Sequence, residues 1–233
     1  MIFGFSTGDL HDYMEPKQAI AEFKKIGCRA VELGFVRKER IEAGELAAIT
    51  EEDLAGFDYV SLHAPRMDYA DNQETFKIFQ AISETHKLRP LDVVVIHPDN
   101  VIDIDIFDDL PFPVGFENMD KAKNFGKKPE DLSKLLTLNT LFRFILDVNH
   151  IWDNDPTMKL AADFIKEFSE RLSEIHISGL DSENVHYPLF KTRQTEIIKA
   201  AKGLDVPFIC ESGLAPQELA LEKDYIEKEF NSL

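Results

Sequence analysis

Short apolar segments recur along the chain roughly 30 residues apart, which is about the length of one βα unit. Their length and their content of Val, Ile, Phe and Leu are typical of strands that are buried on both faces. The eight predicted strands are Ile2–Ser6, Ala30–Phe35, Tyr59–Pro65, Asp92–Pro98, Val114–Asn118, Arg143–Asn149, Glu174–Ser178 and Pro207–Glu211. Few architectures can accommodate eight such units, because parallel strands must be joined by right-handed crossover connections.

Helical patterns occupy most of the intervals between these strands. Apolar residues recur at helical spacing in Lys17–Ile26, Gln73–His86, Glu130–Leu138, Thr157–Leu172, Thr195–Lys202 and Pro216–Phe230. The interval Val101–Asp109 is short and acidic, so any helix there is weak. The alternation predicts a single α/β domain over residues 1–233, a (β/α)8 TIM barrel. An open doubly wound sheet is the alternative, but the first loop lacks the GxGxxG pattern that usually accompanies it.

The charge balance limits the partners of the chain. Its 233 residues contain 26 Lys and Arg against 43 Asp and Glu, which gives a formal net charge of −17. Such a field repels phosphate backbones and attracts divalent cations, so nucleic acid is not an expected partner. No apolar run is long enough to span a membrane, and the N-terminus lacks the features of a signal peptide. We therefore expect a cytoplasmic protein, with Cys28 and Cys210 as small buried residues.

Residues that can bind a metal stand at or near the C-terminal ends of six predicted strands. They are His63, His97, Glu117, Asp147, His176 and Glu211, and a further acid, Glu32, lies inside the second strand. In a parallel barrel the strand ends meet on one rim, so residues far apart in sequence share one pocket. Buried carboxylates are costly unless they are paired or bound to a metal. Oxygen ligands with one imidazole suit Mn²⁺, Mg²⁺, Co²⁺ or Zn²⁺, so the sequence predicts a divalent metal site.

Six motifs carry a family resemblance. HAP, IHP, ENMD, LDVNH, IHISG and ICESG follow one another in an order that resembles the xylose-isomerase-like TIM barrel superfamily. This superfamily includes sugar isomerases and epimerases, inosose dehydratases and the endonuclease IV type of DNA repair enzyme. For the epimerases, the resemblance implies one divalent metal held by Glu117, Asp147, His176 and Glu211. It also implies that the two glutamates form an acid/base pair and that His150 contacts the substrate.

The same resemblance leaves a second interpretation open, because the endonuclease IV type binds three zinc ions. Its first site matches His63, His97 and Glu117, and its second is shared with the four-residue set of the epimerases. Its third site uses a histidine that matches His150, together with an Asp-x-His motif after the seventh strand.

In this chain the Asp-x-His motif is altered. The stretch reads Asn184-Val185-His186, so a neutral amide replaces the aspartate, which weakens the third site. The nearby acids Asp181 and Glu183 are candidates to replace it, although their spacing does not match the motif.

Further side chains are predicted to contact a substrate. Arg66, directly after the HAP motif, suits a carboxylate or a phosphate, and Arg193 is a second candidate. The other predicted substrate contacts are His63, His97, His186 and Glu32, with His11 and Asp12 on the first loop and Trp152 as a pocket wall.

We therefore expect a metal-dependent isomerase or epimerase of a small sugar, polyol or keto compound, working through an enediolate. Glu117, Glu211 and His150 are the predicted catalytic residues. Two alternatives stay open: an endonuclease IV-like zinc phosphodiesterase acting on abasic DNA or another phosphoester, and a barrel that binds a metal or ligand without catalysis. The oligomeric state, including a homo-oligomer, is also open.

Overall fold

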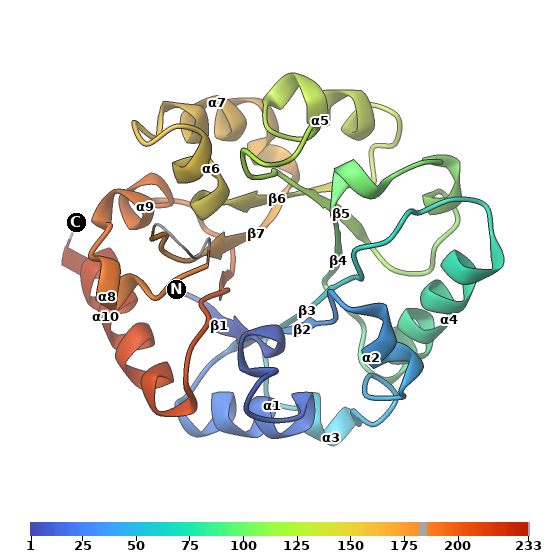
Figure 1. Cartoon of the computed structure of the whole chain (residues 1–233), viewed down its shortest axis with the longest axis horizontal. Coiled ribbons are helices and arrows are strands. Elements are labelled where there is room, and N and C mark those ends of the chain that lie inside the picture. Colours follow the sequence, from blue (N-terminus) through green and yellow to red (C-terminus); the bar gives the residue numbers. More distant parts are fainter. Residues whose placement is uncertain (182–185, 233) are drawn as a thin grey trace.

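Eight parallel strands form a closed barrel in the computed structural model, which describes residues 1–181 and 186–232 (Figure 1). The strands are β1 (Phe3–Ser6), β2 (Ala30–Gly34), β3 (Tyr59–His63), β4 (Val93–Ile96), β5 (Val114–Glu117), β6 (Arg143–Asp147), β7 (Leu172–Ile177) and β8 (Phe208–Cys210). Each strand pairs with the next, and β1 pairs in parallel with both β2 and β8. The closure confirms the predicted (β/α)8 barrel, and the open sheet was the wrong alternative.

Helices surround the barrel as an outer ring (Figure 1). They are α1 (Pro16–Lys25), α2 (Lys38–Glu42), α3 (Glu51–Leu54), α4 (Gln73–Leu88), α5 (Pro129–Leu136), α6 (Val148–Asn154), α7 (Lys159–Phe168), α8 (Leu189–Thr192), α9 (Thr195–Ala200) and α10 (Leu219–Ser232). Short 3-10 turns, η1 (Thr7–Leu10), η2 (Pro98–Asn100), η3 (Asp105–Phe107), η4 (Ser169–Arg171) and η5 (Pro216–Glu218), complete the connections. The acidic interval after β4 contains only such turns, which agrees with the weak helical signal there.

Most predicted boundaries differ from the observed ones by one to four residues, and two of these differences have a local cause. The sixth strand was expected to reach Asn149, but it ends at Asp147, because the Asp147 carboxylate accepts the His150 N–H at 2.8 Å and begins α6. The helix expected over Thr157–Leu172 ends at Phe168, because η4 follows it and Leu172 already belongs to β7.

The barrel interior is divided between an apolar lower part and a polar upper rim. Ala30, Tyr59, Val93, Val95, Ile145 and Ile209 pack together inside the barrel, with Ile2 against them. Gly115 keeps space for this packing, since a Cβ there would lie 2.8 Å from Val93 Cγ2 and 2.9 Å from Ile145 Cδ1. A much larger apolar cluster fills the layer between the strands and the helices. As alternation predicts, Cys210 faces that layer and contacts Glu222 of α10.

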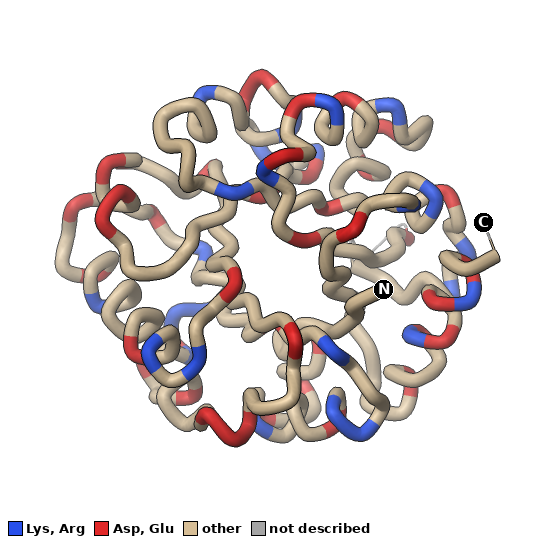
Figure 2. Tube along the Cα trace, turned by 180° about the vertical axis from the view of Figure 1, so that it is seen from behind, with Lys and Arg blue, Asp and Glu red and all other residues tan. Residues whose placement is uncertain are grey.

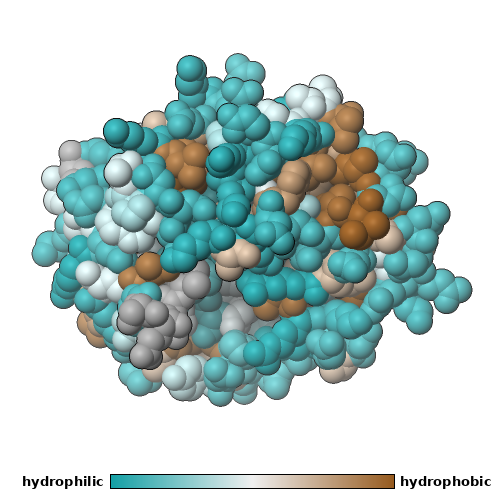
Figure 3. Space-filling model, turned by 45° about the horizontal axis from the view of Figure 1, so that its top comes forward, coloured by the Kyte–Doolittle hydropathy of each residue, from teal (hydrophilic) through white to brown (hydrophobic). Residues whose placement is uncertain are grey.

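The outer surface is charged and mainly hydrophilic. Acidic and basic residues alternate around the ring of helices and loops (Figure 2). Apolar side chains reach the surface in small areas (Figure 3), and the most exposed large ones are Ile102, Leu138 and Leu141. In the described part of the chain, no helix is both long enough and apolar enough to cross a membrane.

Candidate metal-binding active site

Four predicted ligands converge at the C-terminal rim of the barrel. Glu117 and Asp147 are the last residues of β5 and β6, His176 lies in β7, and Glu211 follows β8 directly. One ligand atom from each lies within 4.8 Å of the others. His176 Nδ1 is 3.0 Å from Glu117 Oε1 and 3.2 Å from Glu211 Oε2. The barrel therefore brings together, across 95 residues of sequence, the set that the epimerase resemblance implies.

Local hydrogen bonds fix the Asp147 carboxylate in this group. Asn118, directly after β5, donates from Nδ2 to the Asp147 carbonyl at 2.9 Å, and its Oδ1 accepts the Asp147 N–H at 2.9 Å. The Asp147 Oδ1 atom caps α6, as described above, so only Oδ2 is left for the centre of the rim. The sequence analysis assigned no role to Asn118, although it lies in the ENMD motif.

The electrostatics of the four residues fit a cation. Burial, together with the charges of Glu117 and Glu211, raises the pKa of Asp147 well above its ordinary value. Burial opposes ionisation of Glu117 too, but His176, His63 and His97 hold its pKa well below the usual range. Within the described residues, Asp147 Oδ2 is buried and has no hydrogen-bond partner, and Glu117 Oε2 faces His97 Nε2 at 3.1 Å. Three carboxylates and one imidazole are a donor set for Mn²⁺, Co²⁺, Zn²⁺ or Mg²⁺, so the residues fit the implied metal.

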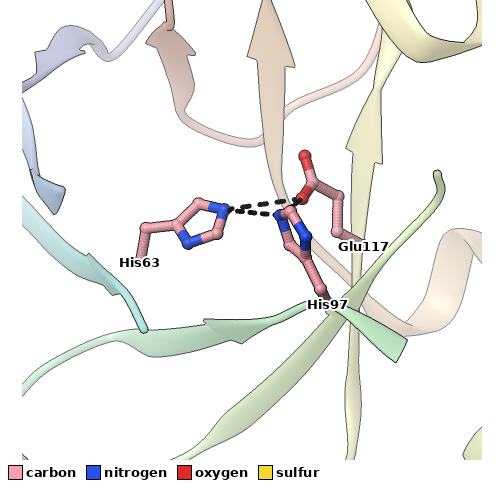
Figure 4. A group of neighbouring side chains, drawn as sticks. All are labelled: His63, His97 and Glu117. Carbon is pink, nitrogen blue, oxygen red and sulfur yellow. Dashed lines mark hydrogen bonds and ion pairs between the residues drawn. The ribbon is translucent and has the colours of Figure 1, made fainter. Parts of the chain in front are cut away.

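A second group lies beside the first and shares Glu117 with it (Figure 4). His97 Nε2 is 3.1 Å from Glu117 Oε2 and 3.1 Å from His63 Nε2. His63 Nδ1 donates to the Ala64 carbonyl at 3.0 Å, so Nε2 is the nitrogen of His63 that faces this cluster and carries the lone pair when the ring is neutral. A backbone carbonyl that fixes the tautomer in this way is typical of metal-binding histidines.

The two histidines of this second group differ in proton affinity. Burial lowers the pKa of His97 to about 4. Burial also opposes the charged form of His63, but its hydrogen bond to Glu117 and the charge of Glu32 raise the pKa of His63 to about 9. The physical reason is that the single charge of Glu117 faces two imidazoles and stabilises one added proton, which His63 carries, while His97 stays neutral.

A third group contains Asp147, His150 and His186, with one ligand atom from each within 4.8 Å of the others. His150 Nδ1 donates to the Asn118 carbonyl at 2.8 Å, so its Nε2 is the free nitrogen. His186 Nδ1 is 3.0 Å from Ser178 Oγ. Glu183 and Asn184, on which part of the three-zinc interpretation depends, lie outside the described residues.

A cavity of about 420 Å³ opens above these groups at the rim. Its lining includes His63, His97, Glu117, His150, His186 and Glu211, and also Arg37, Arg40, Arg66, His11, Asp12 and Tyr13. Its size suits a small molecule. The sequence analysis missed one acid on its wall, Asp9 of η1, whose pKa is raised by burial and by the charges of Glu211 and Glu32.

Three predicted substrate contacts lie away from the cavity wall. Arg193 stacks over the Tyr225 ring, with its guanidinium carbon 4.7 Å from the ring centroid. Trp152 packs against the apolar layer outside the barrel. Glu32 lies beneath the cavity, fully buried, with Oε2 3.3 Å from His176 Nε2.

Comparison with known proteins supports the fold. No family model matches the sequence, and no curated protein matches it. The barrel fold is nevertheless shared with solved structures. A D-tagatose 3-epimerase-like protein has a TM-score of 0.76 at 15% identity, covering 99% of this chain and 97% of that one.

Two further solved structures extend this likeness. An IOLI protein with a bound zinc atom has a TM-score of 0.70 at 13% identity, covering 100% of this chain and 99% of that one. A D-psicose 3-epimerase from Clostridium cellulolyticum H10, solved with D-tagatose, has a TM-score of 0.66 at 9% identity and covers 99% of both chains. The chain thus has the fold of the xylose isomerase-like TIM barrel proteins.

Proposed function

We propose that the chain is a metal-dependent isomerase or epimerase of a small sugar, polyol or keto compound. The observation that carries the proposal is the pair Glu117 and Glu211, which contact the same nitrogen of His176 and both line the small-molecule cavity. The four-residue ligand group supports it, as do similar folds in proteins named as epimerases.

The protein side chains divide the work of moving a proton. When bound by Glu117, Asp147, His176 and Glu211, a divalent ion supplies the Lewis acidity that polarises a substrate carbonyl. Burial opposes the charged form of Glu211, but the neighbouring His176 holds the pKa of Glu211 below its ordinary range. Glu211 is therefore ionised at neutral pH. One of the two glutamates removes the proton α to the carbonyl, and the other, or His150, delivers a proton taken up from solvent to the enediolate.

The arginines that line the cavity suit an anionic substituent of the substrate. Arg37 and Arg66 are among them, and neither pairs with a carboxylate within residues 1–181 and 186–232. A guanidinium binds a carboxylate or phosphate with two parallel hydrogen bonds. His63, His97 and His186 provide hydrogen bonds to substrate hydroxyls in a one-metal site.

Proton exchange provides the test of this proposal. Metal-loaded protein is incubated in D₂O with ketoses and inososes, and NMR follows deuterium at the carbon next to the carbonyl. We expect exchange with wild type and none with Glu211→Gln at equal metal occupancy. Arg193→Ala, outside the cavity, is the matched control and keeps the activity. Exchange that persists in Glu211→Gln would remove the acid/base assignment.

Three of the four candidate ligand groups overlap at the rim, and this overlap favours a zinc phosphodiesterase as the second candidate. Glu117 belongs to two groups and Asp147 to two, an arrangement that a one-metal enzyme does not need. Metal analysis separates the candidates. About one ion per chain favours the isomerase, whereas two or three zinc ions that are lost with His97→Ala favour phosphoester cleavage. Cleavage of an abasic-site oligonucleotide at low salt would then be the direct assay.

A further inference from the structure

A second tier of charged side chains lies inside the barrel, below the metal ligands. We propose that Glu174 and Glu32 are positioning residues that hold the Nε2–H of His176, so that its Nδ1 lone pair faces Glu117, Asp147 and Glu211. This inference rests on the proposed function only in requiring that the four-residue group binds a divalent ion. It does not depend on the substrate or on the reaction.

The His176 ring separates two sets of carboxylates. On the upper side, Nδ1 is 3.0 Å from Glu117 Oε1 and 3.2 Å from Glu211 Oε2. On the lower side, Nε2 is 3.1 Å from Glu174 Oε1, with which it forms a hydrogen bond. Glu32 Oε2 lies 3.3 Å from the same nitrogen. A neutral imidazole has one N–H and one lone pair, so an acceptor fixed below it leaves the lone pair above.

The sequence directs these two acids to the barrel axis by strand alternation. Glu174 precedes His176 by two residues on β7, so both side chains face inward. Glu32 on β2 is in register with Ser61 on β3. Ser61 also faces inward, because Tyr59, two residues earlier, packs inside the barrel and reaches Ser173 on β7.

A purely structural role does not explain why acids stand at this level. The residues two positions before the other rim groups on β4, β5, β6 and β8 are Val95, Gly115, Ile145 and Ile209. Those positions follow the usual apolar or small filling of a barrel interior. Glu174 and Glu32 are instead fully buried, and within the described residues Glu174 Oε2 and both Glu32 oxygens have no hydrogen-bond partner. Buried acids without partners are costly, so the contact with His176 is the feature that accounts for them.

A carboxylate behind a metal-binding histidine has a known physical effect. It fixes the orientation of the ring, selects the tautomer and increases the basicity of the nitrogen that binds the metal. Here two carboxylates share one N–H. Glu174 is the main acceptor, because its contact meets hydrogen-bond geometry. Glu32 adds its charge at a slightly longer distance.

Metal affinity tests the proposal without an activity assay. Co²⁺ binding is measured by competition with a chromophoric chelator for wild type, Glu174→Gln, Glu32→Gln and the control Ser61→Ala. We expect about 10–100-fold weaker binding for Glu174→Gln, the range for residues that support a metal ligand. We expect a smaller loss for Glu32→Gln and no change for Ser61→Ala, which removes a nearby hydroxyl that does not contact His176. Near-UV circular dichroism of each variant checks that the fold is kept.

The tautomer of His176 gives a second readout. In zinc-loaded protein labelled with ¹⁵N in histidine, NMR should show Nε2 protonated and Nδ1 bound to zinc. Zinc bound at Nε2 would overturn the proposal, as would affinities of Glu174→Gln and Glu32→Gln within twofold of wild type. The proposal would also be overturned if either variant bound one metal ion fewer per chain while its remaining ions bound as tightly as in wild type. Glu174 and Glu32 would then be ligands of a separate cation. Wild-type protein that binds no divalent ion would instead contradict the proposed function.

Discussion

Replacing Asp147 by Asn should stabilise the metal-free protein while removing its metal affinity. The Asp147 Oδ1 atom caps α6 through the His150 N–H, and an Asn side chain keeps that cap. The other oxygen is buried without a partner and lies within 4.8 Å of ligand atoms of Glu117 and Glu211. An unsatisfied buried acceptor costs about 1–3 kcal/mol, and more when charged, so we expect Asp147→Asn to gain about 1–3 kcal/mol in chelator.

The matched variant Asp147→Ala separates the cap from the charge. It loses the cap, which is worth about 1 kcal/mol, so it should be less stable than Asp147→Asn by about that amount. In saturating metal, wild type should become more stable to unfolding than Asp147→Asn. A ligand at 100 times its dissociation constant adds about 2.7 kcal/mol to the protein that binds it, and the variant lacks one of four ligands.

The pH dependence follows from the sign of the pKa shift. Burial and the charges of Glu117 and Glu211 raise the pKa of Asp147 above its unfolded value of about 3.9. At this group the folded metal-free chain keeps a proton that the unfolded chain releases, so the contribution of Asp147 to stability falls as the pH rises. The extra stability of metal-free Asp147→Asn over metal-free wild type should vanish below about pH 3.9. It should grow as the pH rises through the raised pKa of Asp147. Urea unfolding in EDTA measures both effects, and a variant less stable than wild type at neutral pH would refute the reasoning.

Three further changes test other parts of the structure. Metal removal by EDTA should lower the Tm by several degrees, and added Zn²⁺ should restore it; an unchanged Tm would count against the metal site. Arg66→Ala should raise KM for anionic substrates with little change in kcat, and Arg66→Lys should reverse only part of this rise in KM. An equal rise in KM for neutral substrates would argue against anion binding by Arg66. Gly115→Ala should lower the free energy of unfolding by about 0.5–2 kcal/mol, because the added Cβ would crowd Val93 and Ile145. In urea unfolding, combining it with Ile145→Val should cost less than the sum of the two single changes. Strictly additive effects of the two substitutions would exclude that contact.

The rim of the barrel was predictable because two simple periodicities act together. A repeat of roughly 30 residues predicts parallel strands, and alternation along each strand predicts which side chains face the axis. Glu117, Asp147, His176 and Glu211 could therefore be placed on one rim before any contact was known. His63 and His97 followed from the same rule, and the structure places both beside Glu117.

Contacts across the barrel axis were harder to predict, since they depend on register and on side-chain direction. Glu174 shares the inward face with His176 by alternation but was not predicted as part of the site, and nothing in one strand shows that Glu32 of β2 meets the same imidazole. The role of Asn118 depends on a contact with β6, 29 residues away. Short helices such as α3 also escaped the periodic pattern, because four residues are too few to display it.

The pairing of β1 with β8 has a consequence for how the protein is made. These strands are the first and the last of the barrel, so the sheet has two open edges until β8 has been synthesised. Unpaired edges favour wrong association between chains, and the nascent chain is therefore most vulnerable before this final step. Glu211 follows β8 directly, so the same step completes both the barrel and the four-ligand group. A chain arrested before β8 would keep its open edges and lack the last acid of the proposed metal site, so the fold and the proposed site would be completed in the same step.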